Sequence, residues 1–471
     1  MTRCLFWNLE HFGERRFYNA AVDNDVDANL PWVQSSADRT ALLYRVIEAS
    51  NPDIIVIVET LAQMAKQSKI AQRITAPLQL LNWLRTTAPI AVISPGWRLV
   101  PPLWLAGQPQ NVGLETVAVF YRGATGTTQR FFTGPNIWPG GVDGPPVLPG
   151  IRTPAAYGTN TRLGQRVDLN ALLVPPTTAA RPIPLNALHN GGTDENKVAA
   201  RIKLRLDNAG TPGADIDFGV ARPPFMVTFT EEDNSGALRD LTLFGVHSPA
   251  NSTGAEDYIT VLSTAYEVIT PLGVHETRIV GGDFNANLLR VDGSLNPVFD
   301  PLTTRNYRQL LRPTAAAPVT PDALAAWRGY FGTHISPLDD PRLVLNRQTS
   351  RFLWSDGGTA SYYPPYRYQS EAFDSIDNVL VWPWDGHRNY QTTIINTVVS
   401  SPLSAVAPLP AGVSAGTIPI AAEISPIPPL VWPQAPNAAD YDATNAGTLL
   451  EWQRYGHIYG TSDHFALFTD I

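Results

Sequence analysis

Cysteine and lysine are scarce in this chain of 471 residues. Cys4 is the one cysteine, which excludes an intrachain disulfide. The positive charge is carried almost entirely by arginine, because lysine occurs only at Lys66, Lys69, Lys197 and Lys203. The net charge of −8 argues against a polyanion-binding tail, although it leaves room for a local basic cleft.

Long hydrophobic runs are also missing. No stretch approaches the ~20 apolar residues that a membrane-spanning helix needs. The apolar run at residues 4–7 is short and passes directly into polar residues, unlike a signal peptide. We therefore expect a protein without a membrane span, either cytoplasmic or exported without a classical signal peptide. No helix-turn-helix, zinc motif or basic stripe is present, so sequence-specific DNA reading is not expected.

The apolar segments that are present predict an α+β fold. Helical spacing is found at residues 36–50 and 254–270, and residues 223–230 and 240–248 form a predicted hairpin. Further strands are predicted at 3–9, 54–59, 115–122, 277–283, 375–382 and 462–471. Early strands alternate with helices and late ones do not. This pattern favours two packed, mainly antiparallel sheets with helices outside.

Three stretches rich in proline and glycine interrupt these elements, at about 123–215, 286–372 and 386–455. They are too long for ordinary loops. The 42 prolines and 35 glycines of the chain form no repeat, which indicates long structured loops. We interpret the three stretches as insertions into a single domain that spans residues 1–471.

Polar side chains with acid–base or metal-binding chemistry lie where the apolar runs begin or end. A buried strand that ends in such a group holds it rigidly at the edge of a sheet. One such strand end is ordinary, whereas a whole set indicates a shared site. The residues in question are Asn8, Glu59, His247, Asp283, Asn285, Asp377, Asp463 and His464.

Five motifs around these residues carry a family resemblance. In order, "WNLEHFG", "PDIIVIVE", "GGDFNAN", "SIDNVLV" and "SDHFAL" resemble the endonuclease/exonuclease/phosphatase superfamily. The strings "ETVAVFYR", "RPPFMVTF" and "HSPANS" are similar to those of deoxyribonuclease I-like nucleases. The resemblance implies a four-layered α/β/β/α sandwich and metal-dependent phosphodiester hydrolysis, and it runs from one end of the chain to the other.

Phosphodiester hydrolysis requires a cation site and groups that move protons. A hard cation prefers oxygen ligands, so we expect Asn8, Glu59 and Asp463 to bind Mg²⁺ or Mn²⁺. Asp283 suits orienting or deprotonating the attacking water, and Asn285 can donate a hydrogen bond to a phosphate oxygen. Taken alone, Glu59 could instead cap the following helix, and Asp283 could form an Asx-turn.

His247 and His464 are the expected proton-transfer or phosphate-stabilising pair. The resemblance implies that Asp377 orients His464, that Glu115 orients His247, and that Arg222 contacts DNA. Five other histidines lie outside the motifs and are expected to be structural or on the surface: His189, His275, His334, His387 and His457.

The function expected from these features is a DNA endonuclease with little sequence specificity. Alternatives are a sphingomyelinase-like or phosphoinositide-phosphatase-like lipid hydrolase, or a nuclease toxin. Two strings typical of inositol phosphatases are absent, which disfavours that class. The scarcity of lysine and the expected lack of a signal peptide are the features that keep the toxin alternative open. The oligomeric state is left open.

Overall fold

The computed structural model describes about half of the chain. A helix that is long and apolar enough to cross a membrane is not found among these residues. The described residues are 1–12, 36–61, 75–104, 115–133, 207–216, 218, 224–250, 252–273, 275–313, 316–317, 319, 324, 331–335, 343–346, 351–354, 373–386, 390–395 and 462–471.

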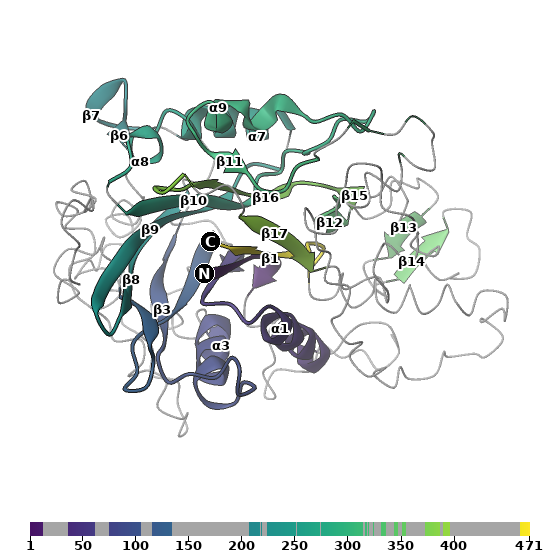
Figure 1. Cartoon of the computed structure of the whole chain (residues 1–471). Helices are drawn as coiled ribbons and strands as arrows, with labels where there is room; N and C mark the ends of the chain where they lie inside the picture. The colour runs from purple at the N-terminus through teal and green to yellow at the C-terminus, as the bar shows by residue number, and fades with distance from the viewer. Residues whose placement is uncertain are drawn as a thin grey trace, which may run out of the picture.

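Two six-stranded sheets form the centre of the molecule (Figure 1). In spatial order, the first sheet contains β17 (Gln391–Ile395), β18 (Ala466–Asp470), β1 (Arg3–Phe12), β2 (Ile54–Leu61), β4 (Glu115–Arg122) and β3 (Trp97–Trp104). The second contains β11 (Arg308–Gln309), β16 (Asp377–Trp382), β10 (Glu276–Asp283), β9 (Gly236–His247), β8 (Phe225–Asp233) and β5 (Arg130–Thr133). Each sheet has one parallel pair, β1–β2 and β9–β10, and its other pairs are antiparallel.

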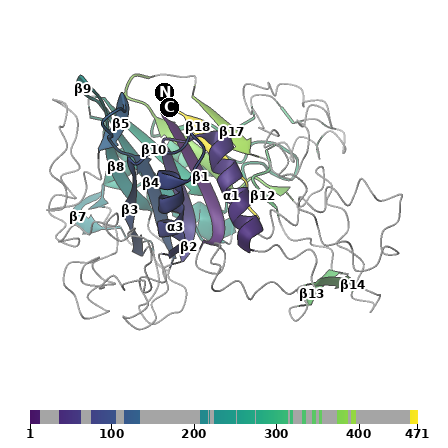
Figure 2. The ribbon, with the colours of Figure 1, turned by 90° about the horizontal axis from the view of Figure 1, so that it is seen from below.

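Helices cover the outer faces of both sheets, which gives four layers (Figure 1). Helices α1 (Ser36–Ser50) and α3 (Thr75–Thr86) lie against the first sheet, as the view from below also shows (Figure 2). On the second sheet lie α7 (Ser252–Leu262), α8 (Tyr266–Ile269) and α9 (Asp300–Thr303). The predicted α+β sandwich of two mainly antiparallel sheets is therefore confirmed.

The two sheets pack closely near the end of β10. Phe6 of β1 is buried between them and faces Gly281 of β10. A Cβ atom on Gly281 would lie 2.6 Å from the Phe6 ring, closer than packed carbon atoms approach. Glycine at this position therefore lets the sheets meet just before the polar residues that follow Gly282.

The helix predicted at residues 254–270 is wrong in one respect, because it is broken into α7 and α8. Between them the Ser263 and Thr264 hydroxyls donate to main-chain carbonyls three residues earlier, at 2.7 Å each. Such side-chain bonds compete with the helical hydrogen-bond ladder. Ala265 then adopts an extended conformation and bridges to Asn208, which ends the first helix.

The predicted insertions lie mostly outside the described residues. Their described parts nevertheless contribute to the core, since β5, β11 and β17 fall inside the three ranges and each joins a core sheet. The core therefore extends further into these ranges than the proline and glycine content suggested. The single-domain boundaries stay a prediction.

Candidate active site

The two parallel strand pairs bring four polar residues to one edge of the sandwich. In the first sheet Asn8 of β1 pairs with Val58, next to Glu59 of β2. In the second, His247 and Asp283 are register partners at the ends of β9 and β10. Parallel neighbours end at the same side of a sheet, and this edge therefore collects side chains from both sheets.

Asn8 connects the two sheets. It is buried, and its Nδ2 atom lies 3.1 Å from Glu59 Oε1 and 3.0 Å from Asp283 Oδ2. The same atom is 3.4 Å from Nε2 of His464. A single amide thus touches residues from β2, β10 and the segment before β18, and the expected meeting of these distant segments is present in the structure.

Glu59 is directed toward the site by an irregular backbone. The pairing of β2 with β4 shifts register between Ile57 and Thr60, and Glu59 has a positive φ of 57°. Bulges re-aim side chains near sheet ends, and a left-handed glutamate is strained. Glu59 Oε1 lies 3.1 Å from His247 Nε2, so the strained part of β2 places a carboxylate against an imidazole of the other sheet.

Asp283 and Asn285 follow a position near the end of β10 that needs glycine. Gly282 has φ of +135°, and a Cβ there would lie 2.3 Å from the carbonyl oxygen of Val246. Asp283 Oδ1 accepts from the Asn285 backbone N–H at 2.8 Å. The Asn285 Nδ2 atom donates to Ser248 O at 3.0 Å and to Asp283 Oδ2 at 3.3 Å. Asn285 therefore positions Asp283. For the Asn285 side chain to donate to a phosphate oxygen, Nδ2 would have to give up its hydrogen bond to Ser248 or to Asp283.

His464 is held on several sides. Its Nδ1 atom lies 2.8 Å from Asp377 Oδ2, and its carbonyl accepts from Trp7 Nε1 at 2.9 Å. Its Nε2 atom faces Asp283 Oδ2 at 3.7 Å. Burial alone would lower the pKa of His464, but the charges of Asp377 and Asp283 outweigh it and raise the pKa well above its ordinary value. The structure brings Asp377 and His464 into contact, and the orienting role of Asp377 stays a prediction.

Two expected site residues lie where the structure describes no side chain. Glu115 is the first residue of β4, and its side chain lies outside the described residues, as does the whole of Arg222. Their roles stay predictions. The carboxylates that the structure places near His247 are Glu59, at 3.1 Å, and Asp283, at 3.6 Å.

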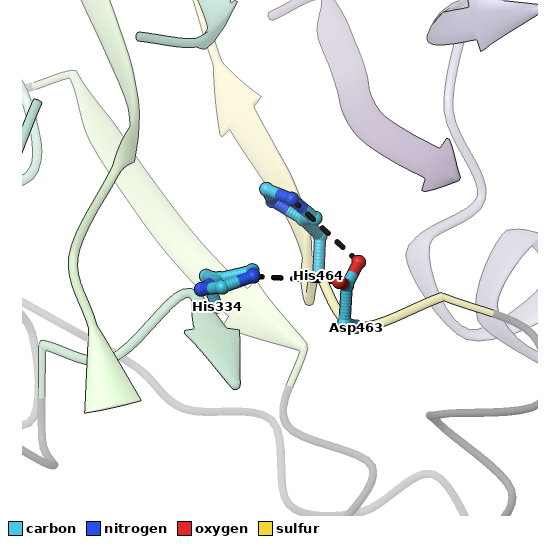
Figure 3. A group of neighbouring side chains, drawn as sticks. All are labelled: His334, Asp463 and His464. Carbon is cyan, nitrogen blue, oxygen red and sulfur yellow. Dashed lines mark ion pairs between the residues drawn. The ribbon is translucent and has the colours of Figure 1, made fainter. Parts of the chain in front are cut away.

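His334 is the site residue that sequence reasoning missed. It lies on β12 (His334–Ile335), and its Nε2 atom is 3.4 Å from Asp463 Oδ2 (Figure 3). Burial and His464 would lower the pKa of His334, but Asp374 and Asp463 outweigh them and raise it. Burial would raise the pKa of Asp463, but the imidazoles outweigh that effect and lower it to about 2. The string "GTHIS" contains no motif that could have indicated this neighbour.

The carboxylates of the site are balanced by histidine. Among the described residues, the ion pairs of Asp283, Asp377 and Asp463 are all with imidazoles and none is with lysine or arginine. Three groupings of His and carboxylate side chains have ligand atoms within 4.8 Å of one another: His334, Asp463 and His464; Glu59, His247 and Asp283; and Asp283, Asp377 and His464. The donor set fits a divalent cation, since buried carboxylates are ordinarily paired or bound to metal.

A scan against protein-family models and a search of curated proteins found no match. In structure, the chain is similar to an endonuclease/exonuclease/phosphatase family protein from Leptotrichia buccalis, with 10% identity, a TM-score of 0.36, and 100% of this chain and 99% of that chain covered. It is also similar to the human Nocturnin catalytic domain (11%, 0.33, 83% and 84%) and to a mannosyl-6-phosphatase from Bacteroides thetaiotaomicron (11%, 0.32, 83% and 87%). At these identities and TM-scores, an activity has to be argued from the geometry of the site.

Proposed function

We propose that this chain is a metal-dependent phosphodiester hydrolase of the endonuclease/exonuclease/phosphatase superfamily, with DNA as its substrate. The observation that carries the proposal is the meeting of Asn8, Glu59, Asp283 and His464 at one edge of the sandwich, with His247 beside them. These groups come from five segments far apart in the sequence. Their chemistry is that of proton transfer and oxygen-ligand cation binding.

Asn8, Glu59 and Asp463 would hold the cation, Mg²⁺ or Mn²⁺. Amide and carboxylate oxygens are the ligands that such ions prefer. Glu59 lies beside Asn8, and Asp463 Oδ1 lies 3.7 Å from the His464 nitrogen that also faces Asn8. Bound there, the cation would neutralise charge on the non-bridging oxygens of the phosphate.

The protein side chains then move the protons. Asp283 accepts a proton from the attacking water as a bond forms between the water oxygen and phosphorus. His464, oriented through Nδ1 by Asp377, donates the Nε2 proton to the leaving oxygen as the old phosphorus–oxygen bond breaks. His247 would stabilise the phosphate charge. Asn285 keeps the Asp283 carboxylate in position.

The proposal of DNA as the substrate is based on sequence resemblance, whereas the proposal of hydrolysis is based on the geometry of the site. The supporting features are the sequence strings "HSPANS" and "RPPFMVTF", which are similar to those of deoxyribonuclease I-like nucleases. Little sequence specificity is expected, because no reading element for base edges is found in the sequence.

One panel tests both levels of the proposal. The full chain is assayed on plasmid, single-stranded DNA, RNA, sphingomyelin and inositol phospholipids, each with Mg²⁺ and with chelator. Plasmid nicking that needs Mg²⁺ is the expected result. If a lipid is hydrolysed faster than DNA, the proposed substrate is wrong. If no phosphodiester is hydrolysed in a chelator-sensitive way, the proposed reaction is wrong.

A further inference from the structure

A further group of donor atoms, formed by β12 and the segment before β18, overlaps the proposed active site at Asp463 and His464 (Figure 3). The backbones of His334 and His464 form an antiparallel bridge, and their ring centroids are 4.6 Å apart. Asp463 precedes His464 directly in the chain. The main chain therefore fixes these three side chains next to one another.

Both imidazoles direct the same ring nitrogen at one carboxylate. His334 Nε2 lies 3.4 Å from Asp463 Oδ2, and His464 Nε2 lies 3.7 Å from Asp463 Oδ1. With metal–ligand bonds of about 2.1 Å in a tetrahedral site, neighbouring ligand atoms lie about 3.4 Å apart. The two observed distances reach different oxygens of Asp463, and one ligand atom from each of the three residues lies within 4.8 Å of the others. A small side-chain adjustment would let all three share one cation.

Each imidazole is also backed by a second carboxylate. His464 Nδ1 lies 2.8 Å from Asp377 Oδ2, and His334 Nδ1 lies 3.5 Å from Asp374 Oδ2. Histidines that bind metal ordinarily donate their other ring N–H to a carboxylate, which fixes the tautomer and leaves Nε2 for the ion. His464 has this hydrogen bond with Asp377, whereas the contact of His334 with Asp374 is an ion pair without a hydrogen bond. Three carboxylates against two imidazoles make the group a host for a cation and not for an anion.

We propose that His334, Asp463 and His464 form a binding site for a first-row transition dication such as Zn²⁺. Imidazole ligands favour such ions over Mg²⁺, which prefers the oxygen ligands offered by Asn8 and Glu59. A nitrogen cannot hold a cation and a proton together. Occupancy of this site therefore excludes proton donation by His464, and it also takes Asp463 from the proposed Mg²⁺ ligands. In these two respects the inference depends on the proposed function.

Calorimetric titration of the chelator-stripped full chain tests the site directly. Zn²⁺ and, separately, Mg²⁺ are titrated into wild type, His334→Asn and the matched control His275→Asn. His275 lies at the opposite end of β10 from Asp283, with φ of 62°, a conformation that asparagine adopts readily. Zinc affinity should fall at least about tenfold in His334→Asn, because replacing even a residue that only hydrogen-bonds a metal ligand typically lowers metal affinity by about 10- to 100-fold. In His275→Asn it should stay at the wild-type value. Equal zinc titrations for wild type and His334→Asn would overturn the site.

A measurement on wild type alone covers the case in which His334→Asn does not fold. Crystals soaked in Zn²⁺ should show an anomalous peak within about 2.3 Å of His334 Nε2 and an Asp463 oxygen. Zinc bound only elsewhere, for instance between Glu59 and His247, would overturn the proposal. Calorimetry and the anomalous peak both measure zinc binding, so they test the zinc site even if the protein hydrolyses no phosphodiester. If hydrolysis is found, Zn²⁺ should inhibit the Mg²⁺-supported rate, and a zinc response unchanged in His334→Asn would contradict the mutual exclusion.

Discussion

Strands β9 and β10 bury charged side chains at both ends, but the two ends balance this charge differently. At the site end, Asp283 faces the imidazoles of His247 and His464. At the opposite end, Arg278 donates to both oxygens of Glu276 at 2.7 and 3.1 Å, and all of these atoms are buried. A permanent guanidinium fixes the second arrangement, whereas imidazoles can exchange protons or give way to a cation. The comparison separates buried charge that stabilises the fold from buried charge that is available for chemistry.

The largest expected effect is the loss of stability when Arg278, the guanidinium partner of Glu276, is removed. Arg278→Met should destabilise the protein by about 3–5 kcal/mol, because Glu276 would remain buried and uncompensated. Urea unfolding at neutral pH measures this change. The double variant Arg278→Met/Glu276→Gln should recover part of the loss, since the orphaned charge is removed. A single-variant cost within the ~0.5 kcal/mol of an ordinary surface substitution would contradict the structural role of this end.

The matching change at the site end should affect the rate of hydrolysis most. His464→Asn keeps a hydrogen-bonding group near Asp377 but cannot transfer a proton, so we expect Mg²⁺-dependent hydrolysis to fall at least about 10²-fold. Stability should also fall, because Asp377 and Asp283 lose a charged imidazole partner, so the rates are compared at a temperature where thermal unfolding shows both proteins to be folded. His275→Asn, the same substitution outside the site, should keep the wild-type rate. Plasmid digestion by His464→Asn at the wild-type rate would remove His464 from the proposed mechanism.

Asp240 gives the opposite end a pH signature. It is buried beside Glu276 on the neighbouring strand, and burial raises its pKa to about 7 despite a 2.7 Å hydrogen bond from Thr230. In the unfolded chain the pKa of this carboxyl is about 3.9. Between about pH 3.9 and pH 7 the folded state therefore binds a proton that the unfolded state does not. The stability that this proton contributes is lost as the pH rises through about 7. Asp240→Asn cannot ionise and should be more stable than wild type by roughly 2 kcal/mol at pH 8, about half of the full value of ~1.36 kcal/mol per unit of pKa shift.

The pH dependence of the difference is the decisive measurement. Denaturant unfolding of wild type and Asp240→Asn should give a gap that is small near pH 4 and widens toward pH 8. Other titrating groups are common to both proteins and cancel from the difference. A gap that stays constant across this range would show that Asp240 is already ionised in the folded protein.

The sequence predicted the site end better than its counterpart. Asn8, Glu59 and Asp283 stand out because each ends an apolar run, and pattern alone placed them at the end of a strand. Arg278 and Glu276 lie within the apolar strand "ETRIVGG", where an alternating charge is typical of an exposed face, so their burial as a pair was not predicted. Contacts between segments distant in the chain, such as His334 with Asp463, depend on tertiary packing and leave no local periodicity.

The smallest expected effect concerns the cation at the site end. Glu59→Gln keeps the size and one oxygen of the side chain but removes its charge, so about tenfold more Mg²⁺ should be needed for half-maximal hydrolysis, a change of about 1.4 kcal/mol. Glutamine inherits the same positive φ, so the backbone strain is common to both proteins. Glu256→Gln, an exposed position on α7, is the matched control and should leave the Mg²⁺ titration unchanged. A Glu59→Gln titration that superimposes on that of wild type would remove Glu59 from the proposed ligands and leave its contact with His247 as its role.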